Sequence, residues 1–112
     1  MKFEIFKSEK NGKFFFNLKA KNGQVILSSQ GYAQKAGAKN GIESVRKNST
    51  DDNCYEIKEA ANGKVFFNLC STNTQVIGKS QMYASKSGLK NGIESVKTNA
   101  PEAEVVDLSV AE

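Results

Sequence analysis

Apolar and polar positions alternate in short runs along the chain, then change to a helical spacing, and this order of patterns occurs twice. Alternation with a period of two predicts strands over residues 2–8, 13–20 and 24–29, and again over 54–59, 64–71 and 75–80. Apolar residues at i, i+3, i+4 and i+7 predict helices over 34–47 and 85–98. The alternation over 105–110 predicts one last strand.

The two halves are copies of each other. A shift of 51 positions brings Asn11–Asn48 onto Asn62–Asn99 with identical residues at about 25 of 38 positions and no insertion. We expect residues 1–112 to form a single domain, with internal repeats at 3–49 and 54–100 and a C-terminal strand and tail at 101–112. The fold class is α+β. Two tandem units of three strands and a helix, plus the C-terminal strand, make one mainly antiparallel sheet with two helices on one face.

The ends of the helices and the turns between strands have recognisable signals. Ser85 is a candidate N-cap, whereas its counterpart Gln34 is a poor one. Asn40 and Asn91 are alternative caps of shorter helices. Asn-Gly pairs at 11–12, 22–23 and 62–63 predict two-residue hairpin turns, and Asn73-Thr74, without the glycine, predicts a looser turn or one of another type.

Glycine recurs inside both predicted helices. Gly41 and Gly92 fall on the apolar stripes, which otherwise comprise Ala38, Ile42 and Val45, and Leu89, Ile93 and Val96. Close approach of helix to sheet is the favoured reason, ahead of close approach to a ligand.

The second strand of each repeat separates into two faces. The face expected beneath the helices comprises Phe14, Phe16, Leu18 and Ala20, and Val65, Phe67 and Leu69. The opposite face carries an aromatic ring and an amide from each repeat among lysines. Phe15, Asn17, Phe66 and Asn68 are therefore the candidate partner surface. Such faces also bind single-stranded nucleic acid, but Phe alternating with Lys is equally ordinary in a half-buried strand.

Composition removes several functional classes. The chain has a net charge of +4, without a block of like charges, and contains no His. Catalysis by Ser-His-Asp or Cys-His is excluded, and we expect no metal and no cofactor, since two Cys with no His do not complete a tetrahedral zinc site unless carboxylates join them. The N-terminus lacks the pattern of a signal peptide and no apolar run is long enough to span a membrane, so we expect a cytoplasmic protein without membrane contact.

Cysteine, tyrosine and glutamate are the remaining residue types that are candidates for a chemical role. Cys54 and Cys70 are expected nearly opposite each other on adjacent strands, both facing away from the helices. A disulfide fits this placement, but two free thiols are favoured in a reducing compartment. Tyr32 and Tyr83 precede the helices and are expected to anchor the strand-to-helix turns rather than to act in catalysis. Glu43 and Glu94 are expected to be solvated charges beside Arg46 and Lys97, or caps.

Each repeat contains Asn-Gly-Lys, Phe-x-Asn-Leu, Val-Ile-x-x-Ser-Gln-x-Tyr and Gly-Ile-Glu-Ser-Val-x-x-Asn. With these motifs the chain resembles the YegP-like family of bacterial proteins in its duplicated form, from about residue 3 to residue 100. The resemblance implies two units of three strands, helix and strand that share one sheet and exchange their C-terminal strands. It implies no activity, substrate or cofactor.

We expect a non-catalytic interaction module with an open sheet face, which binds a protein partner or a second copy. A weak nucleic-acid binder is the alternative, and an enzyme is disfavoured because no His and no polar cluster beyond the repeated surface residues is present.

Overall fold

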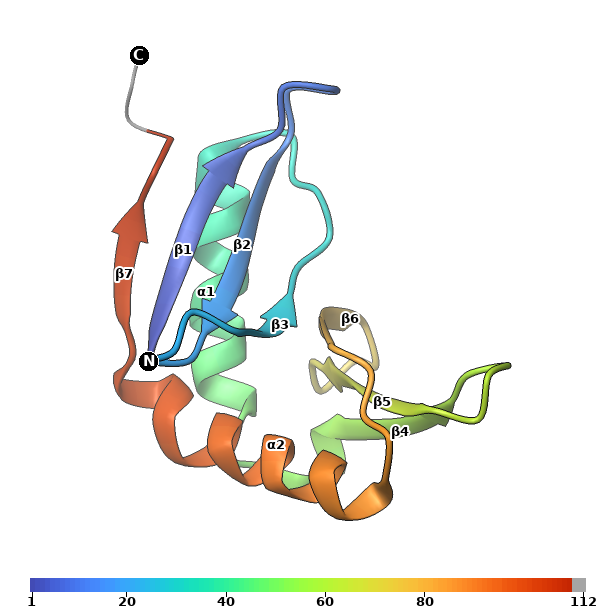
Figure 1. Cartoon of the computed structure of the whole chain (residues 1–112). Coiled ribbons are helices and arrows are strands. Elements are labelled where there is room, and N and C mark those ends of the chain that lie inside the picture. Colours follow the sequence, from blue (N-terminus) through green and yellow to red (C-terminus); the bar gives the residue numbers. More distant parts are fainter. Residues whose placement is uncertain (110–112) are drawn as a thin grey trace.

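A computed structural model describes residues 1–109 and contains one sheet of seven strands in the order β4-β5-β6-β3-β2-β1-β7. The strands are β1 (Lys2–Lys7), β2 (Phe14–Lys19), β3 (Val25–Ser28), β4 (Tyr55–Glu59), β5 (Val65–Cys70), β6 (Val76–Ser80) and β7 (Glu104–Asp107). The helices are α1 (Lys35–Asn48) and α2 (Lys86–Asn99), each followed by a short 3-10 turn, η1 (Asp52–Cys54) or η2 (Ala100–Glu102). Only β1 and β7 run parallel (Figure 1). The predicted α+β class is confirmed.

The predicted elements are present, with their ends displaced slightly. The last strand is shorter than predicted and begins at Glu104, and Val110 lies outside the described residues. Ser85 caps α2 as predicted, because its hydroxyl accepts a hydrogen bond from the N–H of Gly88 at 3.1 Å. Asn40 and Asn91 lie inside the helices, so the alternative of shorter helices capped there is wrong.

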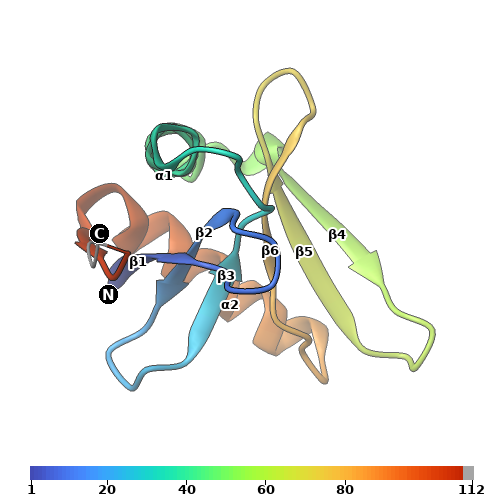
Figure 2. The ribbon, with the colours of Figure 1, turned by 90° about the horizontal axis from the view of Figure 1, so that it is seen from above.

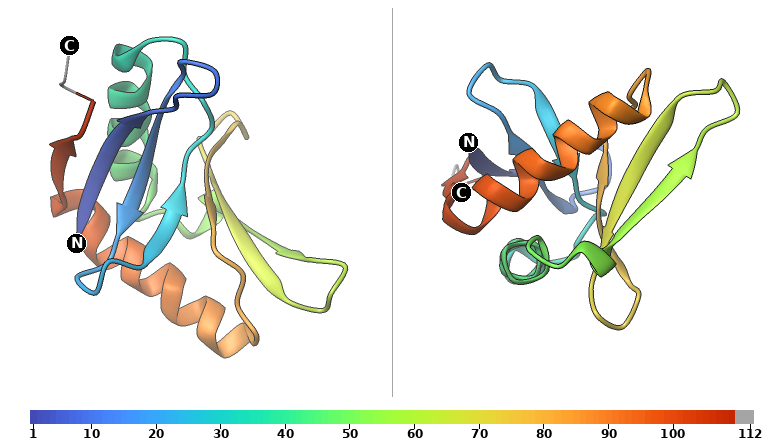
Figure 3. Two further views of the ribbon diagram at one scale, coloured as in Figure 1. Left: turned by 45° about the horizontal axis from the view of Figure 1, so that its top comes forward. Right: turned by 90° about the horizontal axis from the view of Figure 1, so that it is seen from below.

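The two repeats share one core. The predicted apolar stripes of both helices are buried, as are Phe16, Leu18, Phe67 and Leu69 of the sheet. Helix α1 contacts β1 and β2 of its own repeat and also β5 and β6 of the other, while α2 contacts β5 (Figure 3). Because α1 packs against strands of both repeats and η2, which follows α2, packs against α1, the two repeats share one core.

A tyrosine ring lies between helix and sheet in each repeat. Tyr32 stacks on Phe16 with ring centroids 6.3 Å apart, and Tyr83 stacks on Phe67 at 6.4 Å. These rings anchor the start of each helix, as predicted. They also explain the helical glycines, because a Cβ on Gly92 would lie 2.7 Å from Cζ of Tyr83. The close approach is therefore between helix and tyrosine, and not only between helix and sheet.

The hairpin turns differ from the predicted two-residue type. In the loop from Ala20 to Gln24 the N–H of Gly23 donates to the carbonyl of Ala20, and Gly23 has a φ of +85°. This is a three-residue loop, in which the last residue is left-handed. The loop from Ser71 to Gln75 has the same hydrogen bonds, with Thr74 at a φ of +68°. The prediction of a looser or different turn there is therefore wrong.

Thr74 is a β-branched residue in a conformation that favours glycine. We expect Thr74→Gly to raise the free energy of unfolding by about 1 kcal/mol, because the left-handed conformation costs an L-residue about that much. The reverse exchange at the equivalent loop, Gly23→Thr, should lower the free energy of unfolding by a similar amount. A Cβ at Gly23 would meet no other atom within 4 Å, so the cost comes only from the left-handed backbone conformation. Urea unfolding of both variants measures the effect. Equal stability of wild type and Thr74→Gly would show that the backbone is unstrained.

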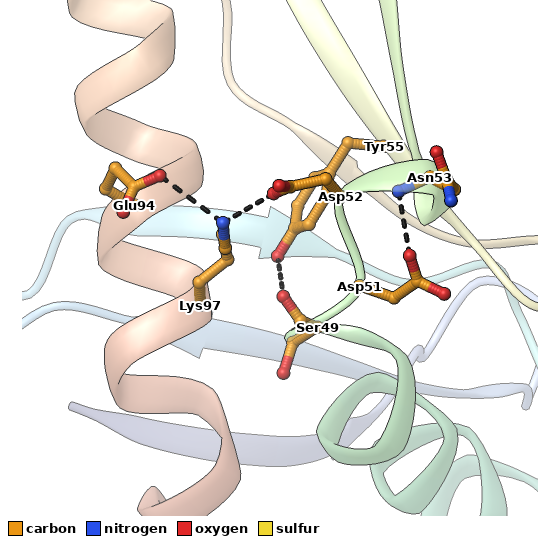
Figure 4. A network of polar contacts seen from close by, with 7 residues as sticks. All are labelled: Ser49, Asp51, Asp52, Asn53, Tyr55, Glu94 and Lys97. Carbon is orange, nitrogen blue, oxygen red and sulfur yellow. Dashed lines mark hydrogen bonds and ion pairs between the residues drawn. The ribbon is translucent and has the colours of Figure 1, made fainter.

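The segment after each helix crosses to the other repeat and is held there by a basic side chain. Arg46 of α1 donates to the carbonyl of Ala103 at 2.6 Å, and Lys97 of α2 pairs with Asp52 and Glu94 (Figure 4). Tyr55 adds a hydrogen bond from its hydroxyl to the carbonyl of Ser49 at 2.6 Å. The two crossings differ in outcome: the segment after α2 forms β7 beside β1, whereas the segment after α1 continues directly into β4. The resemblance implied that each repeat gives a C-terminal strand to the other. Only the strand after α2 is added beside the other repeat in this way, because the strand after α1 is β4, the first strand of the second repeat.

Strand β7 is held to α1 by the carboxylate of Asp107. It accepts hydrogen bonds from the hydroxyl and N–H of Ser109 at 2.6 and 2.8 Å and pairs with Lys35 at 2.9 Å. The hydrogen bonds from Ser109, followed by Lys35, lower the pKa of Asp107 from 3.8 to about 2.

A lowered pKa means that Asp107 contributes stability above its unfolded pKa near 4 and loses that contribution as the pH falls toward 2. We expect Asp107→Asn to lower the free energy of unfolding by about 1 kcal/mol at pH 7, and the difference from wild type to shrink between pH 4 and pH 2. Urea unfolding over that pH range measures it. A difference that is independent of pH would contradict the role of this carboxylate.

Candidate functional site

A row of polar side chains crosses the sheet on the face away from the helices. Strand register places Glu4 opposite Asn17, Asn17 opposite Ser28, Ser28 opposite Lys79, Lys79 opposite Asn68, and Asn68 opposite Glu56. We refer to these residues, Glu4, Asn17, Ser28, Lys79, Asn68 and Glu56, as the polar row. It spans both repeats and is symmetric, since Ser28 and Lys79 are equivalent positions at its centre.

Two of the four predicted surface residues, Asn17 and Asn68, belong to the polar row. The side-chain amide of Asn68 donates to Glu56 at 3.3 Å. At the other end of the row Glu4 is paired with Lys19 at 2.8 Å and Lys2 at 3.3 Å. The pKa of Glu4 is lowered, chiefly by its hydrogen bond with Lys19. The row thus presents carboxylates at its ends and amide, hydroxyl and ammonium groups between them.

The other two predicted residues, Phe15 and Phe66, lie on the same face and are half-buried. Phe15 stacks on Phe6 with centroids 5.7 Å apart, and the Nζ of Lys79 lies 4.7 Å from the ring centroid of Phe66. The two rings are thus equivalent in sequence but have different partners, an aromatic ring in one repeat and a cation in the other.

The structure therefore brings Phe15, Asn17, Phe66 and Asn68 onto one surface. Sequence reasoning missed Glu4, Ser28, Lys79 and Glu56, which complete the polar row. Lys79 and Ser28 meet only because β3 pairs with β6, a contact between repeats that neither strand's own pattern reveals. Their equivalent positions in the two repeats were the one available signal.

One of the two cysteines is not placed as predicted, whereas Cys70 lies on β5 among the positions that face away from the helices. Cys54 lies in η1 and belongs to the core on the helix side, with its Sγ 3.7 Å from Oδ1 of Asn48. The prediction that the side chain of Cys54 faces away from the helices is therefore wrong. Cys70 is half-buried, and both are free thiols. Burial raises the pKa of each thiol, so the thiolate form that reacts is disfavoured.

The remaining candidates have structural partners. Glu43 pairs with Arg46 at 2.6 Å and Glu94 with Lys97 at 3.5 Å, so both are helix-surface charges. Among residues 1–109, no group of three or more Cys, Asp or Glu is arranged to hold a metal ion, and no helix is long and apolar enough to cross a membrane. Chemically, the polar row offers hydrogen-bond donors and acceptors for recognition, but it does not pair a nucleophile with a base.

Comparison with known proteins places these features in a family. The domain of unknown function DUF1508 matches the chain twice, over residues 9–56 and 60–107. Each matched segment contains a β-hairpin and the following helix; the first segment ends two residues into β4, and the second ends with β7. A UPF0339 protein of Stutzerimonas stutzeri, from the 5′ region of a ptx operon, is 53% identical over 106 residues and covers 95% of both chains. The YegP protein of Yersinia pestis is 47% identical over 104 residues, with 93% of each chain covered.

Two solved structures have the same fold. The solution structure of a UPF0339 protein from Shewanella oneidensis has a TM-score of 0.92 and 46% identity, and the match covers 99% of this chain and 93% of that one. The solution structure of YegP from E. coli, described as a protein of unknown function, has a TM-score of 0.90 and 46% identity, with 99% and 95% covered.

Proposed function

The chain belongs to the DUF1508 family, and on that premise we propose that it is a non-catalytic binding module whose open sheet face engages a protein partner. The observation that carries this proposal is the polar row, which runs without interruption across strands of both repeats on the face that no helix covers. Its carboxylates, amides and central ammonium group suit an extended polypeptide, which offers both donors and acceptors along its length.

The test is a pull-down from a lysate of the organism that encodes the chain. Wild type is compared with Phe15→Ala/Phe66→Ala and with a control of the same size, Lys39→Ala/Lys90→Ala, which changes equivalent exposed positions of α1 and α2. Circular dichroism and thermal unfolding establish that each variant is folded. We expect the sheet-face variant to lose proteins that wild type and the helix variant both retain. The same set of proteins from all three baits would contradict the proposal.

A second candidate, weak binding of nucleic acid, is favoured by the contact of Lys79 with the ring of Phe66 and by the nearby Lys2 and Lys19. It is disfavoured by Glu56, whose half-exposed carboxylate repels phosphate, and by Glu4, which already pairs with Lys2 and Lys19. Titration of single- and double-stranded oligonucleotides at low and physiological salt distinguishes the two. No binding at low salt would remove this candidate.

A further inference from the structure

The two outer edges of the sheet are equivalent in the repeat but not in their surroundings. Strand β1 pairs with β2 as β4 pairs with β5: Ile5 lies opposite Phe16, and Ile57 opposite Phe67. These pairs make Ile57 the counterpart of Ile5, and Tyr55 the counterpart of Phe3. On its other side β1 is covered by β7, whereas β4 is the last strand of the sheet among residues 1–109 (Figure 2).

Burial reflects this difference at each matched position. Ile5 is fully buried, whereas Ile57 is 52% exposed and is a large apolar residue on the helix side of the sheet. The side chain of Glu4 is 12% exposed, and that of its counterpart Glu56 is 50% exposed. An exposed apolar side chain on an unpaired edge is a site to which another strand can add.

A hollow adjoins the start of β1 and another adjoins the start of β4, and the two differ in volume and lining. The hollow beside β1 has a volume of about 250 Å³ and is bounded partly by Glu104 of β7. Beside β4 the hollow is larger, about 490 Å³, and its lining includes Tyr55, Glu56 and Cys70 but no residue of another edge strand. The larger hollow adjoins the start of β4 and is also lined by residues 70–72 and 74, at the end of β5 and in the loop after it.

The helix charge that holds β7 is also duplicated. Lys35 at the start of α1 pairs with Asp107 of β7, which lies opposite Ile5. Its counterpart at the start of α2 is Lys86, which is exposed and has no carboxylate within salt-bridge distance among residues 1–109. An incoming strand with an acidic residue opposite Ile57 would give Lys86 the partner that Lys35 has in Asp107.

We propose that the outer edge of β4 accepts an extended segment of another protein as an added strand, parallel to β4. The segment has the chemistry of β7: an apolar residue opposite Tyr55 and, two residues later, a carboxylate opposite Ile57 that pairs with Lys86. Strand β7 of a second copy does not fit this role, because it already covers its own β1. This site is an edge and is independent of the sheet-face proposal.

The probe is the capped peptide acetyl-Glu-Val-Val-Asp-Leu-Ser-amide, which copies residues 104–109. Titrated into the full ¹⁵N-labelled chain, it should shift the amide resonances of β4 and of Lys86 in a saturable manner. A nitroxide at the N-terminus of the peptide should broaden Tyr55 more than Glu59, as a parallel strand requires.

Charge exchange tests the specificity. Lys86→Glu should weaken binding at least about threefold, and a peptide with Lys in place of Asp should recover it on that variant. Lys39→Glu, a change of the same size on α1, should leave binding as in wild type. The proposal is overturned by saturable shifts on β1 or β7 instead, by absence of saturable shifts, or by equal binding of both peptides to both proteins. Concentration-dependent shifts of β4 without peptide would assign the edge to a second copy and would also overturn it.

Discussion

Replacing Gly92 with alanine is expected to lower the free energy of unfolding by about 2–3 kcal/mol, a typical cost of forcing extra atoms into a packed core. The added methyl group would meet the hydroxyl and Cζ of Tyr83, and this ring is held against Phe67. Gly41→Ala should behave alike, since its Cβ would lie 2.8 Å from Cε2 of Phe16 and nearer still to the hydroxyl of Tyr32. Urea unfolding of the variants measures both effects.

Two controls isolate the cause. Gly88→Ala lies in the same helix, where the nearest atoms are 3.6 Å away, and it should raise the free energy of unfolding by up to about 1 kcal/mol through helix propensity. Combined with Gly92→Ala, Tyr83→Phe should restore part of the lost free energy of unfolding, because it removes the hydroxyl oxygen that lies nearest to the added methyl group. That hydroxyl is buried with no hydrogen-bond partner among the described residues, so Tyr83→Phe alone should cost little. A Gly92→Ala variant as stable as Gly88→Ala would refute the tyrosine contact.

The second large effect is a difference between the two edges of the sheet. Ile5→Ala is expected to lower the free energy of unfolding by about 3 kcal/mol, because the residue is fully buried beneath β7 and α1. Ile57→Ala, the matched change on β4, should cost about 1 kcal/mol or less, because the side chain is largely exposed. Urea unfolding of both variants gives the comparison. Equal losses would show that the β4 edge is covered in solution.

Much of the fold follows from the sequence, since alternation, helical spacing and the repeat predict every strand and both helices. The misses have local causes. Thr74 adopts a left-handed φ because the ladder on either side of its loop imposes the same turn as in the other repeat. Cys54 is turned into the core because the crossing segment after α1 forms η1 before β4 begins.

The candidate site was predictable only in part, because part of it depends on how strands of the two repeats pair with each other. Phe15, Asn17, Phe66 and Asn68 follow from alternation within one strand. The rest of the polar row depends on which strand lies next to which, and β3 beside β6 is a contact between segments far apart in sequence. Likewise, Ile5 and Ile57 are equivalent in strand pairing, although the shift of 51 positions does not align them, and their different burial follows from the pairing of β7 with β1.

Duplication completes one edge of the shared sheet and leaves the other open among residues 1–109. Amide hydrogen exchange on the isolated chain tests it most directly. In β1 all amides from Phe3 to Ile5 should be protected to a similar degree, because β2 and β7 bind both sides of the strand. In β4 protection should alternate, and amides directed away from β5 should exchange at least about a hundredfold faster than their neighbours. Uniform protection along β4, equal to that of β1, would contradict the claim.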